Sequence, residues 1–178
     1  MAQRVSGWLA WIVFELFDDD LSSDGVGQAM AKEKYLIIII LLLGLGLRLI
    51  NLNQSLWLDE AAQAIMASKS VGEIWSARQA DFHPPLFYII SHYWMQVSHS
   101  EVWLRLLPVI FGVISIYLIY LTPPPSPKLG EGNARGVVFP LFAAFFLAIN
   151  SYHIYYSQEF RSYSLLAMLG ILSMYFLV

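Results

Sequence analysis

Two adjacent carboxylates, Asp59 and Glu60, lie just past the end of the first long apolar run of the sequence, Tyr35–Ile50. A run of that kind indicates a membrane helix, so both acids are expected at the boundary between membrane and water. Charged groups at membrane depth are costly, and one that is kept there is by default a candidate functional residue. A carboxylate in this place could act as a general base that takes the proton of an acceptor hydroxyl. The alternative is an interfacial loop whose two acids are simply solvated.

Two later polar stretches carry residues that could complete such a site. Glu159 and Arg161 follow the third long apolar run, and a guanidinium such as that of Arg161 binds phosphate oxygens in a fork and stays charged. The alternatives for Arg161 are a salt bridge with Glu159 or anchoring to lipid headgroups. His83, Asp81 and Glu159 could offer nitrogen and oxygen ligands to a divalent metal. The sequence leaves metal binding open, because His83 also suits a polar position at a helix start.

Two further arginines have both a structural and a functional interpretation. Glu101 and Arg105 are spaced i,i+4 at the start of an apolar run, in the order that favours a helical ion pair. The alternative for Arg105 is a contact with substrate. Arg48, near the end of the first apolar run, could extend its charge toward the interface, or it could face an anionic ligand.

Composition places the chain among membrane proteins. Of its 178 residues 58% are hydrophobic and only 13% are charged, and the mean hydropathy is +0.59. Those values and the long apolar runs indicate membrane spans. The net charge of −3 and the absence of a basic stripe argue against nucleic acid as a partner. Cysteine is absent, which excludes a disulfide framework and thiolate metal sites.

The elements that must position these residues follow from the apolar runs, and the predicted fold class is an all-α, polytopic membrane protein. About four spans are expected, at Tyr35–Ile50, Val102–Leu121, Val137–Tyr156 and Ser162–Val178. The segment Asn51–Ser100 is a large first external loop that contains helices near the interface, one of them at Ala61–Ser70. A further helix should begin at Pro84 and Pro85. Residues 1–29 are predicted to be an extension outside the fold formed by residues 30–178, and Thr122–Gly136 is a Pro-rich polar loop.

The position of Leu86–Val97 decides whether the polar stretches can meet. This apolar stretch would rise only about 18 Å as a helix, which is short of the roughly 30 Å hydrocarbon core, so we expect it to lie along the surface. Asp59 and Glu159 then emerge on the same face. If Leu86–Val97 spanned the membrane, they would lie on opposite faces. The predicted orientation, with the segment Asn51–Ser100 outside, is not favoured by the distribution of Lys and Arg, because positively charged loops normally lie inside.

Taken in order, the polar stretches resemble a known family of enzymes. They are Ser55-Leu56-Trp57-Leu58-Asp59-Glu60-Ala61, Asp81-Phe82-His83-Pro84-Pro85-Leu86, Glu101 with Arg105-Leu106-Leu107-Pro108, and Tyr156-Ser157-Gln158-Glu159-Phe160-Arg161-Ser162-Tyr163. The ordered set resembles the bacterial branch of the dolichyl-phosphate-mannose–protein mannosyltransferase-like family, which are integral membrane glycosyltransferases of the C type. The resemblance covers about residues 34–178 and is interrupted at the Pro-rich loop.

The resemblance implies a multi-pass enzyme of the plasma membrane and cell envelope. It implies a polyprenyl-phosphate-linked sugar donor, a protein, lipid or glycan acceptor, and an essential Asp in the first external loop. By that resemblance Asp59 is the catalytic carboxylate, with Glu60 orienting it or pairing with a cation. Glu159 and Arg161 match the second external-loop motif, and His83 matches the loop that borders the same cavity. The chain departs from the family in lacking its many further spans, so it corresponds to the amino-terminal part of such an enzyme.

Two other functions compete with this one. The chain could be a non-catalytic membrane protein or an inactive remnant of such an enzyme, in which the polar residues serve assembly. A transporter is the weaker third hypothesis. Transporters place charges and broken helices near the bilayer midplane, whereas the acids of this chain lie at the ends of the predicted spans.

Overall fold

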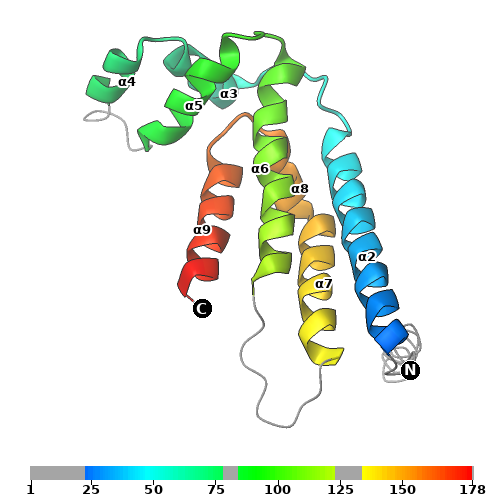
Figure 1. Ribbon diagram of the computed structural model, residues 1–178. Helices are drawn as coiled ribbons and strands as arrows, with labels where there is room; N and C mark the ends of the chain where they lie inside the picture. Colours follow the sequence, from blue (N-terminus) through cyan, green and yellow to red (C-terminus); the bar gives the residue numbers. More distant parts are fainter. Residues whose placement is uncertain (1–22, 78–83, 123–133, 178) are drawn as a thin grey trace, which may run out of the picture.

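The computed structural model describes residues 23–77, 84–122 and 134–177, and every regular element in those ranges is an α-helix (Figure 1). The all-α class predicted from the sequence is therefore confirmed for this part of the chain. The helices are α2 (Ser23–Leu49), α3 (Leu58–Ala67), α4 (Val71–Ala77), α5 (Pro85–Met95), α6 (Glu101–Leu121), α7 (Ala134–Ile149), α8 (Ser151–Gln158) and α9 (Tyr163–Leu177).

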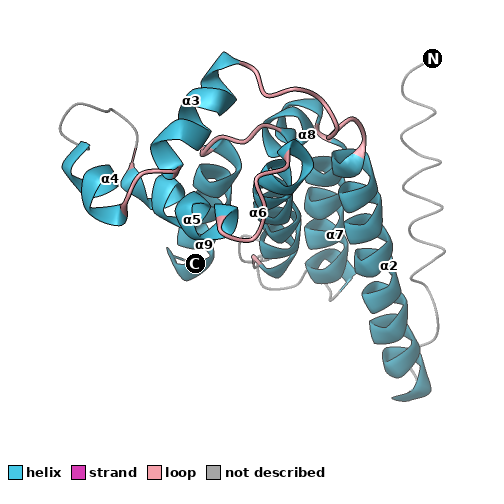
Figure 2. Cartoon of the chain, turned by 90° about the horizontal axis from the view of Figure 1, so that it is seen from above, coloured by secondary structure: helices cyan, strands magenta, loops and turns pink. Residues whose placement is uncertain are grey.

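The longer helices form a bundle in which the chain direction alternates. In Figure 1 α2 rises, α6 descends beside it, α7 and α8 rise again, and α9 descends against α6. The short helices α3, α4 and α5, the cap helices, lie across the upper end of this bundle, its cap end. Figure 2, seen from above, shows them over the α9 side of α6 and away from α2. The predicted surface helix Leu86–Val97 corresponds to α5, which packs against α3 and α4 at the end of the bundle.

Helix α6 is, within the described ranges, the one helix that is both long enough and apolar enough to cross a membrane. The apolar helical stretches Phe139–Ile149 and Tyr163–Leu177 are shorter. The structure therefore gives one candidate span, at the position predicted for Val102–Leu121.

Three predicted boundaries differ from the observed ones. Helix α2 begins at Ser23 instead of Tyr35, so the predicted boundary after residue 29 falls inside a continuous helix. Helix α3 ends at Ala67, short of the predicted Ser70. The segment Val137–Tyr156, predicted as one continuous helix, is divided into α7 and α8 at Asn150. The Asn150 side chain accepts a hydrogen bond from the His153 amide at 2.9 Å, and an N-cap of this kind starts a new helix.

Two apolar clusters hold these helices together. The upper cluster joins the cap helices to the bundle and contains Ala67, Phe87, Met95, Leu104, Leu107, Phe111, Phe160 and Leu165. The lower cluster joins α2, α6 and α7 and contains Ile37, Ile116, Leu141, Ala144 and Ala148. Phe160, in the turn between α8 and α9, is fully buried in the upper cluster and packs on Phe87 with ring centroids 5.6 Å apart. The turn after α8 is thus fixed against the cap helices.

The connection from α5 to α6 is closed by two tryptophans. The rings of Trp94 and Trp103 stack with centroids 4.4 Å apart and planes 8° apart. Each indole also donates to the backbone carbonyl of the other residue, at 2.8 Å and 3.0 Å. On the other side of α5, the His92 ring lies 3.0 Å from the Ala67 carbonyl. The cap helices are therefore tied both to each other and to the start of α6.

Arg48 does not extend toward the interface as predicted. Its side chain is fully buried and turns inward toward α7 and α8. One terminal nitrogen donates to the Gly44 and Ala148 carbonyls, and the other to the Leu147 carbonyl and to His153 Nδ1. The last carbonyls of α7 form the negative end of the helix dipole, and they attract this cation. Arg48 thus holds α2 against the break between α7 and α8.

Candidate functional site

Asp59 and Arg161 meet at the cap end of the bundle. Asp59 is the second residue of α3, and Arg161 lies in the short turn between α8 and α9. Arg161 Nη1 donates to Asp59 Oδ2 at 2.8 Å, and the side chains are 20% and 47% exposed, respectively. This contact brings the first and last polar stretches together at one end of the bundle. The partner that the sequence suggested for Arg161, Glu159, is replaced by Asp59.

Two aromatic rings frame the guanidinium of Arg161. Its central carbon lies 4.7 Å from the centroid of the Tyr163 ring and 5.8 Å from that of the Trp57 ring, within the range of cation–π attraction. Trp57 immediately precedes α3, and Tyr163 begins α9. Both rings were overlooked as site residues, although each lies within the two sequence stretches that pointed to the site.

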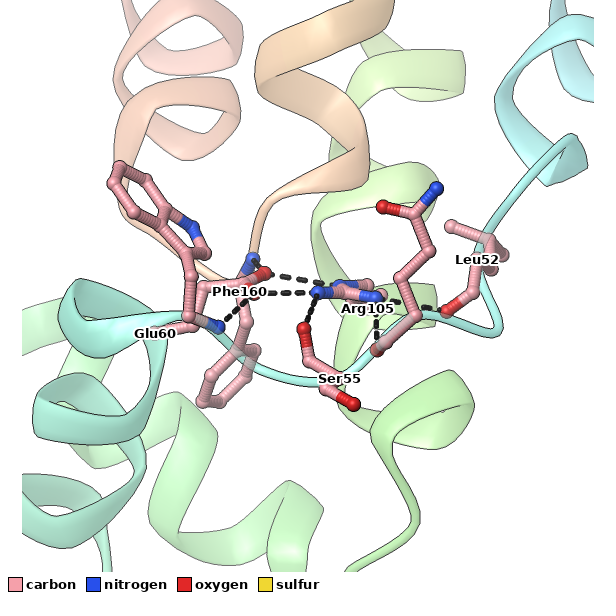
Figure 3. Close-up of polar contacts among 7 residues, drawn as sticks. Leu52, Ser55, Glu60, Arg105 and Phe160 are labelled. Atoms are coloured by element: carbon pink, nitrogen blue, oxygen red, sulfur yellow. Dashed lines mark hydrogen bonds and ion pairs between the residues drawn. The ribbon is translucent and has the colours of Figure 1, made fainter.

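Glu60 has surroundings opposite to those of its neighbour. Its side chain is fully buried, and both carboxylate oxygens accept hydrogen bonds (Figure 3). Oε1 accepts from Arg105 Nε at 3.0 Å and from the Phe160 amide at 2.7 Å, and Oε2 forms an ion pair with Arg105 Nη2. Oε2 also accepts a hydrogen bond from the Trp57 amide at 3.4 Å. Glu60 is thus engaged inside the protein, which leaves Asp59 as the exposed acid of the pair.

Arg105 uses all five of its N–H donors on the junction between Glu60 and the chain segment that precedes α3. Two go to the carboxylate of Glu60. The other three go to backbone carbonyls of the chain between α2 and α3, those of Leu52 at 3.0 Å, Gln54 at 2.6 Å and Ser55 at 3.2 Å. A guanidinium has five donors and no more, so none remains for a substrate phosphate or for Glu101. The predicted i,i+4 pair is therefore wrong, because Glu60 takes the place of Glu101 as the partner of Arg105.

Glu159 is buried beside this junction with one oxygen unsatisfied. Its side chain is 7% exposed, and Oε2 has no hydrogen-bond partner among the residues that the structure describes. Its backbone carbonyl accepts from the Arg161 amide at 2.7 Å, which makes the turn tight and brings Arg161 out toward Asp59. A buried carboxylate oxygen without a partner is unfavourable, so a ligand that donates a hydrogen bond or carries positive charge would stabilise it.

The metal site cannot be assembled from the described residues. His83 and Asp81, two of the three predicted ligands, lie outside them. Within the described ranges no three His, Asp or Glu side chains gather in a way that could hold a metal ion. Glu159 is the predicted ligand that the structure places, and it lies at the same end of the bundle as the Asp59–Arg161 pair.

Chemically, the site presents one exposed carboxylate and one partly exposed guanidinium in direct contact. A carboxylate can accept a proton, and a guanidinium can bind an oxyanion. Comparisons of the chain with models of protein families, with curated proteins and with solved structures found no match. The chemistry of these residues therefore has to be judged from their own geometry.

Proposed function

We propose that the chain is a membrane glycosyltransferase, or the amino-terminal part of one. It would transfer a sugar from a polyprenyl-phosphate-linked donor to an acceptor hydroxyl at the cap end of the bundle. The observation that carries this proposal is the 2.8 Å contact between Asp59 and Arg161, which joins the carboxylate and the guanidinium of the two motifs on an exposed surface.

The setting in a membrane is supported by the apolar side chains that the longer helices leave exposed. They include Ile38, Ile39, Leu42, Leu43, Phe139, Phe142, Phe145, Phe146, Leu166, Leu169, Met174 and Phe176. Soluble monomers rarely expose apolar surface on this scale, whereas lipid covers it without cost. We propose four spans, formed by α2, α6, α7 with α8, and α9, in a plasma membrane. The cap helices then lie at the interface, where the polyprenyl donor would present its phosphate.

The reaction needs a base, a cation and a good leaving group. The lipid phosphate leaves with the electron pair of the bond to the sugar's anomeric carbon, and the acceptor oxygen forms the new bond to that carbon. Arg161 would bind the phosphate oxygens in a fork and neutralise the departing charge. Asp59 would take the proton of the acceptor hydroxyl, a role typically worth about 10²–10⁴-fold in rate.

Binding of the donor would also change the pair itself. In the structure, Asp59 and Arg161 neutralise each other through one contact between their terminal atoms. A phosphate that draws Arg161 away would leave Asp59 without its cation and ready to accept a proton. Glu159, with its free oxygen, would receive a sugar hydroxyl or a divalent metal, and His83 is expected to border the same space.

A non-catalytic membrane protein is the second candidate, and one observation favours it. Glu60 and Arg105 find every partner they need inside the chain, as expected for groups whose role is to hold loops together. Asp59 and Arg161 could be a further, exposed example of the same arrangement.

The deciding experiment replaces Asp59 by Asn in membranes that carry the chain in its full-length context. Asp59→Asn keeps the shape of the side chain and removes the base, so transfer from a polyprenyl-phosphate sugar should fall by at least about 10²-fold. Glu73→Gln is the matched control, because Glu73 is an exposed acid of the same loop that caps α4 through Ser70. Near-normal transfer by Asp59→Asn, with normal protein level, would leave the non-catalytic interpretation standing.

A further inference from the structure

We propose that Glu60 and Arg105 form a positioning pair, which sets the distance and orientation between Asp59 and Arg161 and touches neither donor nor acceptor. The inference rests on the function proposed for Asp59 and Arg161. It gives different roles to two residues that the sequence placed in catalysis and substrate binding.

The first step is the relation between the exposed pair and the buried one. Asp59 is followed by Glu60, and Arg161 is preceded by Phe160. The exposed residues meet at 2.8 Å, and the buried residues beside them meet at 2.7 Å, where Glu60 Oε1 accepts from the Phe160 amide. The two chain segments are therefore joined one residue away from the reacting groups on each side, and this second contact does not depend on the first.

The second step is the anchor of that contact. Arg105 lies one turn inside α6, between Leu104 and Leu107 of the upper apolar cluster, and its side chain is 7% exposed. It holds Glu60 through two bonds and the segment before α3 through three carbonyls, so its position fixes the start of α3 (Figure 3). Because every N–H donor of Arg105 is used, a substrate could bind its guanidinium only by breaking this junction.

The third step is the environment. Glu60 and Phe160 are fully buried. In such surroundings a complete charged network rigidifies the structure, and loss of one partner strongly lowers the stability of the fold. The exposed pair is a single ion contact that water reaches, although the Trp57 and Tyr163 rings lie against its guanidinium. The buried pair therefore decides where Asp59 points after Arg161 has turned to the phosphate. A displacement of about 1 Å at that stage can cost about 10²-fold in rate.

The test measures the geometry without relying on activity. The sequence contains no cysteine, so the double variant Asp59→Cys/Arg161→Cys has only the two thiols of interest. A bifunctional thiosulfonate with a short spacer should link them within one chain in high yield. Adding Glu60→Gln or Arg105→Lys should lower the yield several-fold, because each removes part of the buried junction. Adding Glu73→Gln should leave it unchanged. All yields are scored on protein that elutes as a single folded species.

A second arm measures transfer with the cysteines absent. Arg105→Lys should lower kcat by about 10²-fold and change the KM for donor much less, since orientation and not phosphate binding is lost. A large rise in donor KM with kcat preserved would identify Arg105 as a substrate contact and overturn the proposal. Glu60→Asp keeps the charge but is too short to reach Arg105 and Phe160 together, so it should behave like Glu60→Gln in both arms.

The remaining outcomes also decide whether Glu60 and Arg105 have this positioning role. Unchanged cross-linking in folded Glu60→Gln and Arg105→Lys proteins would overturn the positioning role. Failure of all three variants to fold would make the junction a requirement for folding alone, which also overturns it. If Asp59→Asn retains normal transfer, the proposed function fails by itself, and the cross-linking yields still show whether the junction sets the distance between positions 59 and 161.

Discussion

Asp59 and Glu60 are chemically alike, adjacent in the chain and opposite in environment. The side chain of Asp59 is 47% exposed and that of Glu60 is 0% exposed. Neighbours on a helix diverge by about 100°, so at the start of α3 one acid faces water and the other faces α6. The same side-chain chemistry therefore lies in two environments, and the exposed acid is the one that a substrate could reach.

The two acids should differ sharply in their contribution to stability. Glu60→Gln leaves the guanidinium of Arg105 buried without its counter-charge, and loss of one partner of a buried pair costs about 3–5 kcal/mol. Asp59→Asn removes an exposed ion pair, which is worth about 0–1 kcal/mol. Unfolding by a denaturing detergent, followed by tryptophan fluorescence, measures both. Equal losses of stability would contradict the division of roles between these residues.

Arg161 should be sensitive even to the conservative change to Lys. A lysine ammonium keeps the charge but cannot form the planar fork that binds two phosphate oxygens. Arg161→Lys should therefore raise the KM for the polyprenyl-phosphate donor more than the KM for the acceptor. Steady-state transfer measured with each substrate varied in turn separates the two. Equal changes in both KM values would indicate that Arg161 orients Asp59 and does not bind the donor.

At the scale of the elements, close helix contacts depend on particular glycines. Gly112 of α6 faces Ser157 of α8 so closely that an added Cβ would overlap the serine Oγ and Cβ, and it would also lie 3.1 Å from Arg48 Nε. Gly46 of α2 is different, because a Cβ there meets no atom of the described residues within 4 Å. These two glycines form a matched pair for testing the packing of the bundle.

Gly112→Ala should destabilise the bundle, and Gly46→Ala should not. Overpacking of a tight contact costs about 1–3 kcal/mol, whereas Ala in an open helical position is favoured over Gly by about 1 kcal/mol. Thermal unfolding in detergent, followed by circular dichroism, gives the sign of each change. A Gly112→Ala protein as stable as the parent would show that α6 and α8 do not approach each other as the structure describes.

At the scale of the whole molecule, the cap helices and the start of α2 lie at opposite ends of the bundle (Figure 1). Ser68 and His99 are exposed near the cap end, and Lys34 is exposed on α2 toward the other end. If the bundle crosses a membrane, residues at the two ends must lie on opposite sides of it. The absence of native cysteine makes this arrangement directly measurable.

Single cysteines should therefore divide into two groups when they are labelled in sealed vesicles. If α5 lies at the membrane surface as proposed, Ser68→Cys and His99→Cys should react with a membrane-impermeant thiol reagent from one side, and Lys34→Cys from the other. The impermeant reagent applied before and after vesicle lysis gives the measurement. Labelling of Ser68→Cys and His99→Cys from different sides would mean that α5 spans, and the shared site would then be impossible in the membrane.

The periodicity and length of the apolar runs predicted those features of the fold that depend on local sequence. The helical class, the position of α6, the placement of α5 at the end of the bundle and the shared end of Asp59 and Glu159 all follow from apolar runs and their alternation. Such features need only the sequence within one element, or the count of elements between two residues. The roles proposed for Asp59 and Arg161 came from a resemblance in the same stretches and remain predictions.

Tertiary structure decided which partner each charged group takes. The sequence offered Arg105 an acid four residues away, yet the fold pairs it with Glu60, 45 residues earlier. The sequence suggested that Arg48 extends toward the membrane interface, yet in the fold its side chain donates to carbonyls that lie 99 and 100 residues later. A local pair competes with water on a helix surface, whereas a buried guanidinium needs several acceptors at one point, and only the packing of segments distant in sequence supplies the five that Arg105 contacts. That requirement, which no local pattern records, separated the buried Glu60 from the exposed Asp59.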